Sequence, residues 1–208
     1  MTEPFRPIAD DLWGRPCLAI HVQPGFAPGA QERLHALQGQ AAALWPGALH
    51  RAPAHAIHVT IYPLVPVPDG FDKEAHWRAV EAPIRAILAE LCADAPALTL
   101  RFNRLKVTPV GLIAVAEEAT GLVARIRARI LSDLPPPPGR EHVHYDLVHT
   151  TLARFASADP VPPEAVAAVE SHPVAVNAPV DRIRLFRETL FPCIVGEELE
   201  TYRLRDGR

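Results

Sequence analysis

Two short segments of this chain share one pattern of residues that could do chemistry. Residues 58–61 read His-Val-Thr-Ile and residues 149–152 read His-Thr-Thr-Leu, so both read histidine, any residue, threonine, aliphatic. The chain has 10 His in 208 residues, and random placement of its residues predicts only roughly 0.07 such tetrads. Two tetrads, one in each half of the chain, therefore indicate a paired functional site.

Strand geometry decides which way the tetrad side chains face. Residues two apart on a strand point to the same side. His58 and Thr60 therefore project together, as do His149 and Thr151. The neighbouring apolar side chains can face a core instead: Val59, Ile61 and Leu152.

In-line attack at phosphorus is the chemistry suited to two such pairs. Imidazole titrates near neutral pH, so one histidine can protonate a leaving alkoxide while the other accepts a proton from the attacking water or hydroxyl. The threonine hydroxyls can donate hydrogen bonds to the non-bridging phosphate oxygens. The tetrads thus predict His58 and His149 as catalytic residues and Thr60 and Thr151 as substrate-binding residues.

These residues resemble the 2H phosphoesterase superfamily, typified by bacterial RNA 2′,3′-cyclic phosphodiesterases, also called 2′-5′ RNA ligases. Its members carry two His-x-Thr/Ser-x motifs on central strands of a two-lobed fold, and the four side chains line one cleft. His58 and Thr60 match the first motif, and His149 and Thr151 match the second. The resemblance implies a pseudo-twofold pair of antiparallel sheets around that cleft, and phosphate chemistry that needs no metal or other cofactor.

Two further residues beside the motifs are candidates for binding substrate. Arg154 follows the second motif but has the opposite parity, so an unbroken strand points it away from the cleft and only a bulge would turn it inward. Tyr62 has the same parity as the first motif and could stack on a base, although core packing explains it equally well. Ile61 and Pro63 depart from the pattern of the RNA ligase branch, whereas Arg154 is similar to it.

Other functions stay open beside the phosphodiesterase hypothesis. Either tetrad alone could be a hydrogen-bonded core histidine beside a strand-favouring threonine. A metallohydrolase could use a larger set of histidines, although no Asp or Glu completes a familiar ligand motif. That set is His55, His58, His142, His144 and His149. A binding module without turnover could use the same cleft to hold a nucleotide or another phosphorylated ligand.

The elements that must position these residues alternate along the chain. Hydrophobic periodicity predicts helices over 31–45, 73–91, 122–134 and 164–170. Runs of β-branched and aromatic residues predict strands over 17–22, 56–64, 143–155, 180–190 and 199–204, and a hairpin of 98–102 with 110–116. Because no linker is long enough to separate independent domains, we expect residues 1–208 to form one α+β domain with two lobes, each with strands backed by helices.

Composition limits the partners and the setting of the protein. A formal net charge of −3 argues against an extended groove that tracks nucleic acid, so we expect a small nucleotide or an RNA end as substrate. Three cysteines without metal-like spacing favour a reducing compartment. The acidic start is unlike a signal peptide, and no apolar run approaches the length of a membrane helix. We therefore expect a cytoplasmic monomer that does not contact membranes.

Overall fold

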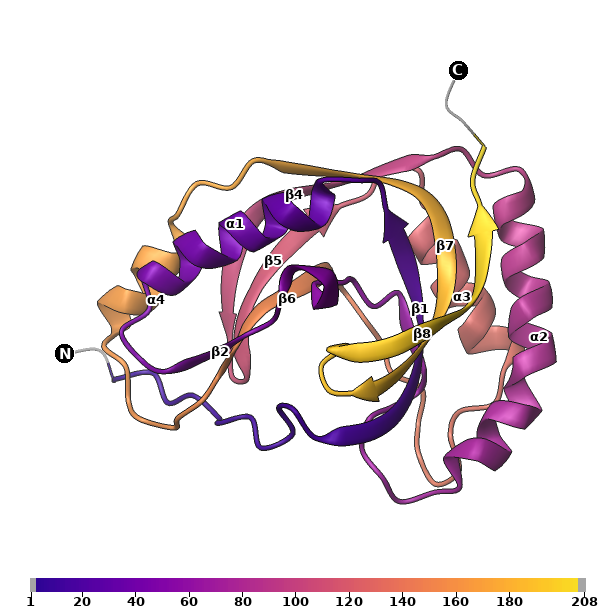
Figure 1. Cartoon of the computed structure of the whole chain (residues 1–208), viewed down its shortest axis with the longest axis horizontal. Coiled ribbons are helices and arrows are strands. Elements are labelled where there is room, and N and C mark those ends of the chain that lie inside the picture. Colours follow the sequence, from indigo (N-terminus) through magenta and orange to yellow (C-terminus); the bar gives the residue numbers. More distant parts are fainter. Residues whose placement is uncertain (1–2, 206–208) are drawn as a thin grey trace.

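The computed structural model describes residues 3–205, and across them an antiparallel sheet is flanked by helices (Figure 1). The helices are α1 (Ala30–Ala43), α2 (Lys73–Ala93), α3 (Leu122–Asp133) and α4 (Pro163–Glu170), with a 3-10 turn η1 (Ala54–Ala56). The strands are β1 (Pro16–Phe26), β2 (Leu49–Arg51), β3 (Tyr62–Val65), β4 (Leu98–Thr108), β5 (Gly111–Glu117), β6 (Val148–Phe155), β7 (Val176–Leu190) and β8 (Val195–Arg203). The predicted α+β class is confirmed.

The sheet runs through both halves of the chain and brings its two ends together. Its strand order is β2-β6-β5-β4-β7-β1-β3, with β8 added beside β7. The two halves join where Leu98 of β4 pairs with Val180 of β7. At the other end, Val59, just before β3, forms an isolated antiparallel bridge with Thr150 of β6. Both tetrads therefore lie where the segment before β3, at one end of the strand order, contacts β6, near the other end.

The helices divide into two groups that support the two halves of the sheet. Figure 1 shows α2 and α3 packed together at one end of the molecule, whereas α1 and α4 lie toward the other end. Asp72 caps α2 by accepting a hydrogen bond from the Ala75 amide at 2.9 Å. Pro83 lies within α2, and the helix continues through it. None of the described helices has both the length and the apolar character needed to cross a membrane.

The strands that carry the tetrads are shorter than the sequence predicts. The expected strand over 56–64 is instead the turn η1, an extended segment, a bend at Ile61 and then β3. The extended segment is held by single contacts, among them the Ile61 amide donating to the Val22 carbonyl at 2.8 Å. Likewise the strand expected over 143–155 begins only at Val148. Alternation of side chains survives in these segments even where a continuous ladder does not form.

Strand β1 is longer than predicted, because turn residues do not end it. It continues through Pro24 and Gly25 to Phe26. Strand β3 pairs with β1 only as far as Val22, whereas β7 still pairs with β1 at Pro24. Proline has no amide hydrogen to donate, but β1 no longer has a partner on its β3 side at Pro24, so no hydrogen bond to β3 is lost there. A Cβ at Gly25 would lie 2.4 Å from Cγ of Arg182, so the Arg182 side chain fills the space beside this glycine and would have to move for a larger residue. The sequence analysis also missed the short strand β2.

Candidate active site

The two His-x-Thr segments lie directly beside each other. The bridge joins Val59, the middle residue of the first motif, to Thr150, the middle residue of the second. The Thr150 hydroxyl also donates a 2.7 Å hydrogen bond to the carbonyl of His58. Because the pairing is antiparallel, each histidine lies across from the threonine of the other motif. The four side chains are thus presented on one face by two backbones fixed to each other.

All four motif side chains line one cavity of about 290 Å³, near the lower end of the size range of small-molecule sites. The residues expected to face the core are fully buried: Val59, Ile61 and Leu152. The cavity wall adds aromatic and proline side chains to the polar centre. These are Trp13, Tyr145, Phe191, Pro63, Pro66, Pro68 and Pro192. The arrangement can hold a small polar group at the centre and a flat apolar group at the wall.

Arg154 lines the same cavity because the sheet is irregular beside it. Ile113 of β5 pairs with Thr151, and Leu112 pairs with Ala153, so Leu152 is an extra residue in β6. Such a bulge reverses the alternation beyond it, which turns Arg154 inward. Its guanidinium Cζ lies 4.7 Å from the centre of the Phe191 ring, and its Nε lies 3.4 Å from Oδ2 of Asp10. An unbroken strand would have pointed this side chain away.

Tyr62 lies apart from the four motif residues. The bend at Ile61 interrupts the alternation, so Tyr62 does not continue the face that carries Thr60. Its hydroxyl hydrogen-bonds Nδ1 of His142 at 2.9 Å, and the two rings meet edge to face. Tyr62 lines a neighbouring cavity together with Arg140. The structure therefore places Tyr62 next to the candidate site and not in it.

His58 is held in one tautomer by its surroundings. Its Nδ1 donates to the Ala56 carbonyl at 2.8 Å, since a carbonyl can only accept. The Nε2 atom of the neutral ring is then a lone-pair acceptor, and it lies 3.5 Å from Sγ of Cys193. Burial, and next the proximity of His21, lowers the pKa of His58 to about 4. His58 is thus neutral at pH 7, with its free lone pair on Nε2.

His149 sits in a different environment on the opposite motif. Burial lowers its pKa, and the positive charges of Arg127 and Arg154 lower it further. Its Nδ1 is buried without a hydrogen-bond partner among residues 3–205. Tyr145 lies beside it, with ring centres 6.4 Å apart. A bound phosphate would bring the negative charge that favours protonated His149.

Arg127, on α3, donates hydrogen bonds to the backbone beside both motifs. No sequence pattern indicated this role. Its Nε donates to the Ile61 carbonyl at 3.0 Å, and one terminal nitrogen donates to the Leu147 carbonyl at 2.9 Å. Ile61 ends the first motif and Leu147 comes just before the second. A single half-buried guanidinium therefore links the two segments, in addition to the bridge at Val59.

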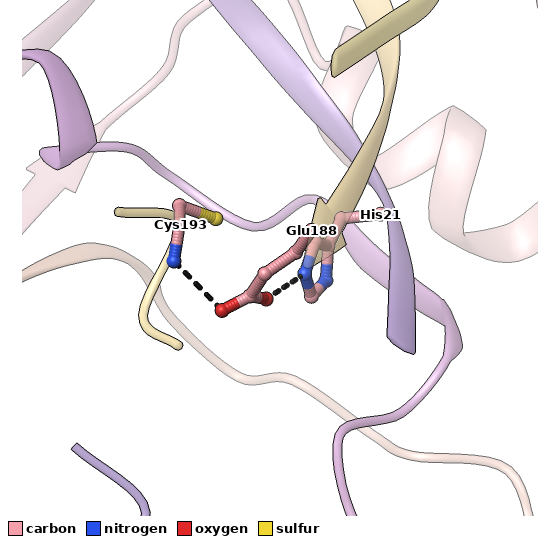
Figure 2. A group of neighbouring side chains, drawn as sticks. All are labelled: His21, Glu188 and Cys193. Atoms are coloured by element: carbon pink, nitrogen blue, oxygen red, sulfur yellow. Dashed lines mark hydrogen bonds and ion pairs between the residues drawn. The ribbon is translucent and has the colours of Figure 1, made fainter. Parts of the chain in front are cut away.

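A buried cluster of three residues, His21, Glu188 and Cys193, is shown in Figure 2. It lies next to His58, whose ring centre is 6.1 Å from that of His21. His21 Nε2 and Glu188 Oε2 are 2.6 Å apart, and Glu188 Oε1 accepts a 2.7 Å hydrogen bond from the backbone amide of Cys193. Burial alone would raise the pKa of Glu188, but the contact with His21 outweighs it and the net pKa is lowered. His21 and Glu188 also line the cavity.

Sequence reasoning missed this cluster because its members meet only through strand pairing. His21 lies within an apolar run of β1 that reads as core. It pairs with Phe186 of β7, and Ala19 pairs with Glu188, so His21 and Glu188 are diagonal neighbours on the sheet. A histidine within the otherwise apolar run 17–22 was the one available signal.

Two other histidines of the predicted metal set, His55 and His142, make contacts elsewhere. His55 is exposed, and its Nε2 contacts the Ile194 carbonyl at 3.1 Å. His142 uses Nδ1 to bind the Tyr62 hydroxyl. Of that set of five, only His58 and His149 line the 290 Å³ cavity.

Comparison with known proteins gives a family and a set of similar folds. The model of the 2′-5′ RNA ligase superfamily matches residues 26–190.

A crystal structure of a Thermus thermophilus protein is 22% identical to this chain, with a TM-score of 0.57 over 91% of this chain and 100% of that one. Escherichia coli LigT complexed with NADP+ is 15% identical, with a TM-score of 0.54 over 90% of this chain and 98% of LigT. A structure described as a phosphoesterase is 13% identical, with a TM-score of 0.52 over 90% and 98%. At these identities the likeness shows the fold. No curated protein matches the sequence significantly.

Proposed function

The chain belongs to the 2′-5′ RNA ligase superfamily, and from this premise we propose that it is a metal-independent phosphodiesterase. Its proposed substrates are 2′,3′-cyclic phosphates or 2′-5′ linkages on RNA ends or small nucleotides. The observation that carries the proposal is the bridge between Val59 and Thr150, which sets two His-x-Thr pairs around one cavity. The NADP+ bound by LigT supports a nucleotide as the class of ligand.

The proposed reaction assigns a task to each group at the cavity. His58 and His149 carry the two proton transfers, one at the attacking oxygen and one at the leaving oxygen. Thr60 and Thr151 donate hydrogen bonds to the non-bridging oxygens, where charge changes in the transition state. The aromatic wall stacks on the base. The reverse joining reaction would use the same groups, because a group that protonates a leaving hydroxyl also deprotonates an attacking one.

A product assay in the presence of EDTA tests this function. The substrates are 2′,3′-cyclic nucleotides, 2′-5′ dinucleotides and RNA with a cyclic end. We expect hydrolysis of at least one class, with a rate within about twofold of the rate without EDTA, because imidazoles supply the proton transfers. Loss of activity in EDTA that zinc or manganese restores would favour a metallohydrolase. Calorimetric heat without product would instead favour a binding module.

The pH dependence of kcat/KM should be bell-shaped with an acidic maximum. The rate rises with pH as the catalytic base loses its proton, and it falls as the catalytic acid loses its own. The pKa of His58 is lowered to about 4, and the pKa of His149 is lowered from its ordinary 6.5. We therefore expect the maximum between about pH 4 and 6.5. A profile that rises through pH 8 would contradict a two-imidazole mechanism.

A further inference from the structure

Three donor atoms group together beside the cavity, and a fourth lies next to one of them. His21, Glu188 and Cys193 each offer one ligand atom, and these atoms all lie within 4.8 Å of one another. Figure 2 shows the Glu188 carboxylate between the His21 ring and the Cys193 backbone amide, with a contact to each. His58 adds a fourth donor, since its Nε2 lies 3.5 Å from Sγ of Cys193. A grouped imidazole, carboxylate and thiol thus adjoin a second imidazole, which would complete four ligands by moving toward the group.

This donor set matches the preferences of zinc. Zinc in proteins is mostly tetrahedral, with nitrogen, sulfur and carboxylate-oxygen ligands. Its bond lengths imply about 3.5 Å between a sulfur and a nitrogen ligand, the separation found between Cys193 and His58. The pair of His21 and Glu188, now 2.6 Å apart, would have to open by roughly 0.7 Å. That is within the reach of a side-chain rotation.

The charges of the ligands would neutralise a divalent ion bound at this buried site. His21, Glu188 and Cys193 are all buried. A divalent cation with one thiolate, one carboxylate and two neutral imidazoles has no net charge, so burial carries a small penalty. The thiol proton leaves to solvent when the metal binds. The proton shared by His21 Nε2 and Glu188 can move to His21 Nδ1, which is buried and unpartnered within the described chain.

Outer contacts already orient the ligands. The Nδ1 of His58 is held by the Ala56 carbonyl, so its Nε2 lone pair is the one available for a metal. The side-chain amide of Gln23 donates to Sγ of Cys193 at 3.5 Å, which suits a thiolate. Arg184 in turn donates to the Gln23 oxygen at 2.9 Å and fixes that amide.

We propose that His21, His58, Glu188 and Cys193 form a zinc site whose occupation inhibits the enzyme. The bound ion uses the Nε2 lone pair of His58, which is then unable to accept a proton from the attacking oxygen. Inhibition rests on the proposed function, whereas metal binding does not. Zinc would thus act on this chain as a reversible inhibitor and not as a catalytic cofactor.

Titration of the metal-free, reduced protein with Co²⁺ and Zn²⁺ tests the site without any substrate. We expect one Co²⁺ per chain, the absorption spectrum of a tetrahedral ion and a sulfur-to-cobalt charge-transfer band that Zn²⁺ abolishes. Cys193→Ser should remove the charge-transfer band and weaken Zn²⁺ binding at least about tenfold. The matched control is Cys17→Ser, which removes a partly exposed thiol outside the cluster and should keep both signals.

Activity in a Zn²⁺ titration then tests inhibition, with each variant normalised to its own metal-free rate. Wild-type activity should fall with the same midpoint as binding, and Cys193→Ser should need at least about tenfold more Zn²⁺. A charge-transfer band that survives in Cys193→Ser or is lost in Cys17→Ser would overturn the site. Binding at Cys193 with unchanged or increased activity would overturn the inhibition. A protein that shows the band but hydrolyses no substrate would refute the proposed function and leave the site established.

Discussion

Replacement of His58 or His149 by alanine should lower turnover of a 2′,3′-cyclic nucleotide at least about a hundredfold, because each removes one proton transfer from the reaction. The two imidazoles line one cavity from segments bridged at Val59 and Thr150. Their environments differ, since His58 is fixed by the Ala56 carbonyl while His149 lies near two arginines. The double variant should lose little more than the worse single variant, because one missing proton transfer already blocks the concerted reaction.

His55→Ala is the matched control for these variants. His55 is three residues before His58, is exposed and contacts only a backbone carbonyl through its Nε2. Its turnover should stay within about twofold of wild type, as expected for a surface change. Thermal unfolding of all three variants separates lost chemistry from lost folding. Less than tenfold loss in both His58→Ala and His149→Ala on a good substrate would rule out the proposed mechanism.

The sequence predicted the residues whose placement depends on local alternation. Two-residue periodicity put His58 with Thr60 and His149 with Thr151, and it put Val59 on the opposite, buried face. These predictions succeeded because alternation needs only extended backbone, which the segment before β3 keeps without a regular ladder. The helices were also predicted well, since their apolar stripes repeat over about two to six turns. Whether the four motif residues are catalytic stays a prediction.

The sequence could not predict features that arise from non-local pairing. The bulge at Leu152 turns Arg154 inward, and the bend at Ile61 takes Tyr62 out of the site. Each is an irregularity at a single residue. Such an irregularity reverses the face on which every later side chain of the strand is expected to lie. The pairing of His21 with Glu188 joins residues 167 positions apart, and no local pattern encodes such a contact. Site geometry was therefore predictable only up to the first break in each strand.

The buried pair of His21 and Glu188 should dominate the response of stability to a single substitution. Glu188→Gln keeps the size of the side chain but removes the charge that His21 Nε2 contacts at 2.6 Å. Breaking a buried pair at one partner typically costs about 3 kcal/mol. For a chain of this size that corresponds to roughly 6–12 °C in Tm. Unfolding of Glu188→Gln at pH 7 by calorimetry or circular dichroism measures the effect.

The matched control and the pH dependence separate a charge effect from lost packing. His21→Leu combined with Glu188→Leu removes both partners, and it should recover most of the stability, because no unpaired polar group stays buried. Since the pKa of Glu188 is lowered in the folded state, its contribution is present above its ordinary pKa of 4.5 and is lost as the pH falls below it. The Tm difference between wild type and Glu188→Gln should therefore shrink below pH 4.5. A difference under about 1 °C at pH 7, or one that grows on acidification, would show that this carboxylate is not held in a stabilising contact with His21.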